Sequence, residues 1–318
     1  MKILHIYPKT DAQLAHYVSM LTTAMENLVE ARTATEANSV AATCKEWQPD
    51  IIHLHGAMPC QLPKRSRTVI SPHGATVSQK AYVVIARSPI EKERLSDRCQ
   101  RIEIVSNPII TRTTSADKTA RQVMEIYQRV MDSNVRELMS EATREALRLL
   151  LKVGISGDRR WACDRTLQEG VNWRQLYIYA RQEGVSQVLQ RGARAFGETT
   201  PVIDTEHIKT YLPDHYQQPK PMKSGYVPTL LDTIAEEIGS RQLSLCRMAE
   251  LHQALMSDTL DEEKLMSELD TKHRKLLSSL LQVASEETLL DEGFMPTSPV
   301  SDHTTRLIRN LINRHLEI

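Results

Sequence analysis

The residues best suited to chemistry in this sequence are histidines that stand in, or just after, short apolar runs. His53 and His55 alternate with aliphatic residues in the run 51–55, and His73 follows the run 69–72. Histidine changes its charge near neutral pH, and its neutral ring is a common metal ligand. Because side chains repeat every two residues along a strand, His53 and His55 share one strand face. These histidines can act on a bound ligand, hold a metal, or form buried hydrogen bonds.

A metal site built from His53, His55 and His73 lacks further ligands in the sequence. No carboxylate or cysteine stands at ligand spacing from them, and buried or loop-capping histidines explain the pattern without an ion. We therefore predict no metal. We also predict no cofactor, because no glycine-rich turn follows a predicted strand, and the glycines within 152–157 end a helical stretch.

The composition restricts the class of protein. The chain has 318 residues, 41% of them hydrophobic, with 40 basic and 40 acidic residues. Without a net positive field, we expect neither nucleic acid nor an anionic membrane as a partner. The five cysteines are spread out and contain no Cys-x-x-Cys pair, which favours a reducing compartment. No apolar run approaches the roughly 20 residues of a transmembrane helix, and we expect a cytoplasmic protein.

The front of the chain alternates short apolar runs with amphipathic stretches. We expect strands at 2–7, 31–35, 51–55, 68–71, 81–86 and 101–105. Helical periodicity lies between several of them. Ser88 can cap one helix, with Pro89 at its first position and Glu91 closing a capping box. The alternation indicates an α/β fold with a small parallel sheet covered on both faces, which binds ligands beyond the carboxyl ends of its strands.

Beyond Asn107-Pro108 the pattern becomes helical. A helix is expected over 115–132, with a break at Ser133-Asn134. Further helices are expected over 138–150, 173–183, 185–196, 228–238, 243–256, 262–283 and 303–316. We therefore predict two domains, an α/β domain over 1–134 and a mostly α-helical domain of unknown role over 135–318.

The spacing of the strand motifs resembles the N-terminal, acceptor-side domain of the family 4 glycosyltransferases, which have the GT-B fold with Rossmann-like domains. The motifs are 50–56, 69–74, 81–88 followed by Lys92 and Leu95, and 102–109. The resemblance implies a Rossmann-like sheet and a ligand cleft at the strand ends. It makes His73 the catalytic candidate, and the implied ligand-binding residues are Lys9, Thr10, His55, Gly56, Gly74, Arg87 and Ser88.

The sequence departs from this family after the first domain. In the family, a second Rossmann-like domain follows and binds the nucleotide sugar through a basic pair and a Glu-x7-Glu loop. Here residues 115–130 resemble the family's final helix, which returns to pack on the first domain, and no strand–helix alternation follows. The loop 8–12 also lacks the family's Gly-Gly pair.

We interpret the chain as a degenerate or split relative of these enzymes. It keeps an acceptor-side cleft and is not catalytic alone. Its expected partners are a protein that supplies the donor-binding domain, and a nucleotide sugar or glycan acceptor. The alternatives are an autonomous glycosyltransferase that uses a nucleotide-sugar donor, and a pseudoenzyme whose helical domain is a protein-interaction or regulatory module.

Overall fold

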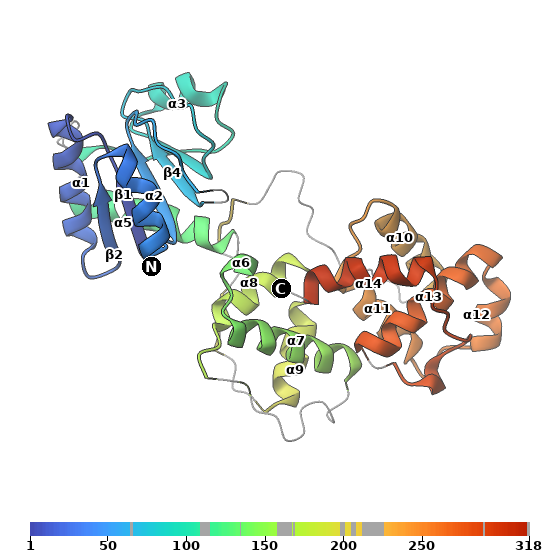
Figure 1. The fold of residues 1–318 in the computed structure, drawn as a ribbon. Coiled ribbons are helices and arrows are strands. Elements are labelled where there is room, and N and C mark those ends of the chain that lie inside the picture. Colours follow the sequence, from blue (N-terminus) through green and yellow to red (C-terminus); the bar gives the residue numbers. More distant parts are fainter. Residues whose placement is uncertain are drawn as a thin grey trace. The chain divides into compact units, whose positions relative to one another are not determined.

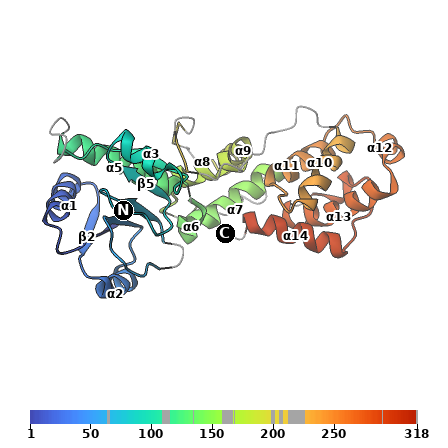
Figure 2. The same cartoon turned by 90° about the horizontal axis from the view of Figure 1, so that it is seen from above.

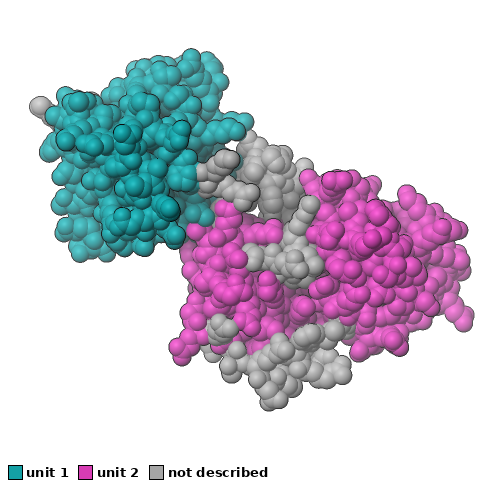
Figure 3. Space-filling view, viewed as in Figure 1, with its two compact units in different colours: residues 1–134, 209–213 teal, residues 135–208, 214–318 magenta. Residues whose placement is uncertain are grey.

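The computed structural model divides the chain into two compact units, shown in different colours in Figure 3. Residues Met1–Asn134 and Lys209–Pro213 form one, here called the sheet unit, and Val135–Ile208 and Asp214–Ile318 form the helical unit. The residues described are 1–63, 66–108, 115–133, 135–157, 167, 169–197, 201–204, 208–211, 226–288 and 290–316. Ile109 of the last sequence motif and Asn134 of the predicted break lie outside them.

The sheet unit contains a six-stranded, all-parallel sheet (Figure 1) with the strand order β2-β1-β3-β4-β5-β6. The strands are β1 (Lys2–Ile6), β2 (Glu30–Ala34), β3 (Ile51–His55), β4 (Thr68–Ser71), β5 (Val83–Ala86) and β6 (Ile102–Ile104). Each coincides with a predicted strand to within two residues at either end. The predicted Rossmann-like α/β fold is confirmed.

Helices cover both faces of this sheet. The alternate residues Ile3, Ile51 and Val69 pack under α1 (Ala12–Met25) and α5 (Ala116–Asp132). The strand residues that alternate with these face the other side of the sheet and pack with α2 (Ala37–Trp47) and α3 (Pro89–Ser96). Figure 2 shows α2 and α5 on opposite sides of the sheet. Burial on both faces explains why β3, β4 and β5 are buried along their whole length.

The helix α5 belongs to the sheet unit although it follows all six strands. Ser115 caps it by accepting a hydrogen bond from the Lys118 amide. Its buried face, which includes Val123, Tyr127 and Val130, lies in the same apolar cluster as α1. Residues 115–132 therefore return to the sheet.

The helical unit contains helices throughout its described residues. They are α6 (Val135–Leu138), α7 (Glu141–Ser156), α8 (Trp173–Gln182), α9 (Ser186–Ala195), α10 (Val227–Gly239), α11 (Leu245–Leu255), α12 (Glu262–Glu268), α13 (Thr271–Thr288), the 3-10 turn η2 (Glu292–Phe294) and α14 (His303–Leu316). One apolar cluster joins these helices. No helix among the described residues is long and apolar enough to cross a membrane.

The single helix predicted over 262–283 is wrong, because the chain breaks there into α12 and α13. Leu269 is extended at the break, and the Asp270 carboxylate accepts a hydrogen bond from the His273 amide at 2.7 Å. A side chain that satisfies a free amide in this way starts a new helix. The apolar periodicity continues across the break, so the sequence pattern did not reveal where α12 ends and α13 begins.

Two glycines allow α7 and α9 to cross in close contact. A methyl group on Gly154 would lie 2.0 Å from the Val188 carbonyl oxygen, and one on Gly192 would lie 2.0 Å from the Leu150 carbonyl oxygen. Each obstacle is backbone, which cannot rotate away. The glycines of 152–157 therefore serve helix packing and the end of α7, where Gly157 adopts a left-handed conformation.

Replacing Gly154 by alanine should destabilise the protein by about 2 kcal/mol or more, because the added methyl group must push the helices apart. Urea unfolding followed by circular dichroism measures this change. Gly239→Ala is the matched control, since that glycine is exposed at the end of α10 and a methyl group would meet nothing within 4 Å. The control should keep or raise stability by about 0.5 kcal/mol; equal behaviour of both variants would contradict the close crossing.

Candidate functional site

The candidate site lies at the carboxyl edge of the sheet, where β1 meets β3. The chain runs from β1 to β2 on one side, then returns past β1 to β3 and continues to β6. Such a change of direction is where open α/β sheets bind ligands. His5 of β1 is the register partner of His53 in β3, and His55 follows on the same face. All three rings are 0% exposed.

His53 is held by hydroxyl groups on both sides of its ring. Its Nδ1 lies 2.5 Å from the Tyr127 hydroxyl of α5, and its Nε2 lies 2.8 Å from Ser71 Oγ of β4. A hydroxyl can donate to an unprotonated ring nitrogen or accept from a protonated one. Both polar atoms of this buried ring are therefore satisfied in the neutral state.

His5, His55 and His73 form a second group of bonded rings. His5 Nδ1 lies 3.0 Å from His55 Nε2, and His55 Nδ1 lies 3.4 Å from His73 Nε2. Tyr17 of α1 packs edge-on against His73, with 5.0 Å between ring centroids. The row leads from the sheet interior to the half-buried His73. At its inner end, His5 Nε2 is buried without a hydrogen-bond partner.

The environment keeps these imidazoles neutral. Burial lowers the pKa of His5 to about 4 and the pKa of His53 and His55 well below the usual value, with further lowering of the latter two by neighbouring histidines. Burial also lowers the pKa of His73 to about 4, although the Glu91 carboxylate opposes that shift. Near neutral pH all four rings are therefore neutral, and each has one protonated and one unprotonated nitrogen.

His73 occupies a strained turn that a buried carboxylate holds in place. Its φ is 51°, a left-handed conformation that costs a non-glycine residue about 1–2 kcal/mol. Gly74 follows with φ 93°, and its amide donates to Glu91 Oε1 at 2.8 Å. The Arg87 amide donates to Glu91 Oε2, also at 2.8 Å. One side chain thus connects the end of β4 to the end of β5.

The predicted capping box at α3 is wrong in its second half. Ser88 Oγ accepts from the Glu91 amide at 3.2 Å, as expected of a cap. The Glu91 side chain, however, bonds the Arg87 and Gly74 amides described above. Glu91 is only 5% exposed and also lies within ion-pair distance of the Arg87 and Arg94 guanidinium groups.

Five of the seven predicted ligand-binding residues fall into two groups at this edge. Gly74, Arg87 and Ser88 surround Glu91, and a methyl group on Gly74 would lie 3.0 Å from Arg87 Nη2. Lys9 and Thr10 are exposed on the loop before α1, where Lys9 Nζ lies 3.7 Å from a Glu36 carboxylate oxygen. The structure brings His55 against His73, whereas Lys9 pairs with Glu36.

A small cavity adjoins Gly56 at the same edge. It encloses about 180 Å³ and is lined by Leu54, Gly56, Ala57, Met58, Pro59, Ile70 and residues 76–79. Leu54 and Ile70 belong to the face covered by α2 and α3. The histidines point to the other face, so the cavity and the rings lie on opposite sides of the strands. A further cavity of about 530 Å³ lies where β5 and β6 begin.

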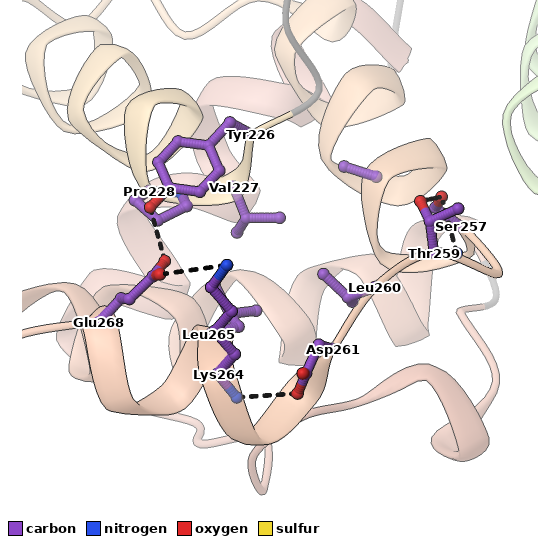
Figure 4. A pocket seen from close by; sticks show the side chains of 11 residues that line it. Tyr226, Val227, Pro228, Ser257, Thr259, Leu260, Asp261, Lys264, Leu265 and Glu268 are labelled. Atoms are coloured by element: carbon purple, nitrogen blue, oxygen red, sulfur yellow. Dashed lines mark hydrogen bonds and ion pairs between the residues drawn. The ribbon is translucent and has the colours of Figure 1, made fainter.

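The helical unit has a separate cavity of about 270 Å³ between α10, α11 and α12, shown in Figure 4. Its polar groups bond one another. The Tyr226 hydroxyl donates to Glu268 Oε2 at 2.5 Å, and Lys264 Nζ lies 4.0 Å from Glu268 Oε1. Asp261 accepts from the Lys264 amide at the start of α12. These polar side chains therefore bond one another within the cavity.

Sequence reasoning did not single out His5, Tyr17, Ser71 or Tyr127. His5 stands at an inward position of the predicted first strand, but only the β1–β3 register shows that it faces His53. Tyr127 lies 74 residues from its partner His53. No spacing rule links residues that far apart. No protein-family model matches the chain, and no curated protein or solved structure matches it significantly.

Replacing Glu91 by glutamine should destabilise the sheet unit by about 2 kcal/mol, because one buried amide would lose its acceptor and face an N–H₂ group. Urea unfolding measures the loss. Glu93→Gln is the matched control on the exposed side of the same helix and should change stability by less than about 0.5 kcal/mol. A Glu91→Gln variant as stable as this control would show that the carboxylate does not hold the turn.

Proposed function

We propose that this chain is a glycosyltransferase-related protein that binds a sugar acceptor at the carboxyl edge of its sheet and does not transfer sugar by itself. The observation that carries the proposal is the placement of His73. It ends a row of bonded histidines, emerges at the end of β4 and is held there in a strained backbone conformation. Strain of this kind in a non-glycine residue is concentrated at functional sites.

The chemistry of this edge suits a neutral, hydroxyl-rich ligand. A neutral imidazole can accept a hydrogen bond from a sugar hydroxyl or donate one to it. Arg87 lies within ion-pair distance of Glu91, and Lys9 lies within ion-pair distance of Glu36. These pairings leave less positive charge for a diphosphate than a nucleotide-sugar site requires. They favour the acceptor, rather than the donor, as the ligand of the sheet unit.

The helical unit supports the second half of the proposal. Transfer from a nucleotide sugar requires groups that stabilise the departing diphosphate. In the resembling family these groups come from a second α/β domain. The described residues of the helical unit contain helices and no strand. A partner protein with a nucleotide-sugar site would therefore complete the enzyme.

The return of α5 to the sheet supports the resemblance itself. Residues 115–130 resemble the family's final helix, which packs on the first domain. Here α5 packs beside α1 and contributes Tyr127 to the histidine cluster. The order of elements is therefore consistent with a chain that passes directly from the sixth strand to that returning helix.

Ligand panels test the proposal. We expect unphosphorylated mono- and oligosaccharides, but not UDP-glucose, UDP-N-acetylglucosamine, ADP-glucose or GDP-mannose, to raise Tm. A ligand at a hundred times its Kd adds about 2.7 kcal/mol of stability, which a thermal scan resolves. His73→Asn should weaken sugar binding at least about tenfold, since asparagine tolerates the left-handed backbone but removes the imidazole.

The control variant is His16→Asn, which changes an exposed histidine on α1 of the same unit. It should bind the sugar as the wild type does. A nucleotide sugar that raises Tm and is consumed by the protein alone would replace the proposal with the autonomous transferase. Sugar binding unchanged by His73→Asn, or no binding of any sugar, would contradict an acceptor site at this edge.

A further inference from the structure

We propose that His5, His53 and His55 form a buried three-histidine site for a divalent transition-metal ion of the zinc class. The sequence offered only His53 and His55 on one strand, and no carboxylate or cysteine beside them. The register of β1 against β3 supplies the third ring. One nitrogen from each ring lies within 4.8 Å of the other two, and all three residues are buried.

The distances are close to those of a bound ion. Zinc lies about 2.0–2.1 Å from a histidine nitrogen, so two ligands of one ion are at most about 4.2 Å apart. His5 Nδ1 and His55 Nε2 are 3.0 Å apart, inside that limit. The three nitrogens lie within 4.8 Å of one another, and binding one ion would require the rings to turn until every separation is below about 4.2 Å. The ligands stand on adjacent parallel strands, a rigid support that keeps them in position.

The ion would replace a hydrogen bond between two of its ligands. His5 Nδ1 and His55 Nε2 bond each other at 3.0 Å, so one of these two nitrogens carries a proton when no ion is bound. With both nitrogens on the ion, His5 and His55 carry their protons on His5 Nε2 and His55 Nδ1, and His55 Nδ1 then faces His73 Nε2.

Polar neighbours can orient the rings for coordination. Metal-bound histidines generally donate their other N–H to a second group, which fixes the tautomer. His55 can donate through Nδ1 to His73 Nε2, and His53 can donate to Tyr127 or Ser71. The other nitrogen of each ring would bind the ion in place of the hydrogen bond that it makes to His5 or to a hydroxyl group.

Imidazole ligands without thiolates suit zinc, copper or nickel better than magnesium or calcium. A site with three protein ligands leaves a fourth position for water or hydroxide. This site does not depend on the proposed function, because zinc binding and sugar binding are measured separately. His73, on which the acceptor site is centred, lies outside the three ligands, although it bonds one of them, His55.

Metal analysis of the full chain tests the inference. Protein expressed without a polyhistidine tag, in zinc-supplemented medium, and dialysed should hold one zinc ion per chain by plasma mass spectrometry. Removing the ion with a chelator should lower Tm, and zinc chloride should restore it. Cobalt(II) in its place should give the visible absorption of a four-coordinate site, a readout that needs no variant.

The variants His5→Asn and His53→Asn should each weaken zinc binding by more than about tenfold. Asparagine keeps a polar group near the position of Nδ1, which limits the cost to folding, and circular dichroism identifies a folded variant. His252→Asn is the control, because His252 is a buried histidine of the helical unit bonded to Thr288; it should keep its zinc.

Two results would overturn the inference. One is wild-type protein that holds no zinc after reconstitution and shows no change in Tm with zinc chloride. The other is undiminished zinc content in whichever of the two ligand variants folds. Sugar binding would be unaffected by the first result, so failure of the metal site and failure of the acceptor site are distinguishable.

Discussion

A polar ring inside a parallel sheet must find its hydrogen bonds within the protein, and the buried histidines of β1 and β3 impose this condition on their surroundings. An unpaired buried polar group is costly, whereas these rings bond Ser71 on the next strand, Tyr127 on the last helix of the unit and one another. The requirement explains why an otherwise aliphatic core contains hydroxyl groups on this face. It also ties α5 to the sheet by a specific bond in addition to apolar packing.

The turn at His73 extends this network to the surface. Its left-handed backbone is unfavourable by itself, so the surrounding contacts must determine it. Glu91 supplies these contacts by accepting hydrogen bonds from backbone amides that follow two separate strands. The position of the imidazole therefore depends on a carboxylate whose own charge is stabilised by backbone donors and nearby guanidinium groups. The position of the His73 side chain at the edge thus depends on the ends of both β4 and β5.

Most of the fold could be predicted from the sequence because the strands are short, apolar and separated by clear helical periodicity. The strand Ile51–His55 was expected with the bounds that the structure has. The break between α12 and α13 was missed because Asp270 interrupts hydrogen bonding without interrupting the apolar pattern. His5 and Tyr127 were missed because they reach the site through strand register and helix return, which no local spacing contains. The sequence pointed to Glu91 as a helix-capping residue, but its hydrogen bond to the Gly74 amide depends on the packing of α3 against β5.

The cavity and the histidine cluster at this edge lie on opposite faces of the sheet. The cavity beside Gly56 lies with the α2 and α3 face, and the histidines lie with the α1 and α5 face. At about 180 Å³ this cavity is smaller than the roughly 300 Å³ at which ordinary small-molecule sites begin, so a ligand there must be small or extend outside. His73 emerges between the interior network and the solvent. Because His73 Nε2 contacts His55 Nδ1, any change in the interior rings that alters which of these nitrogens carries the proton also alters what His73 can offer a ligand.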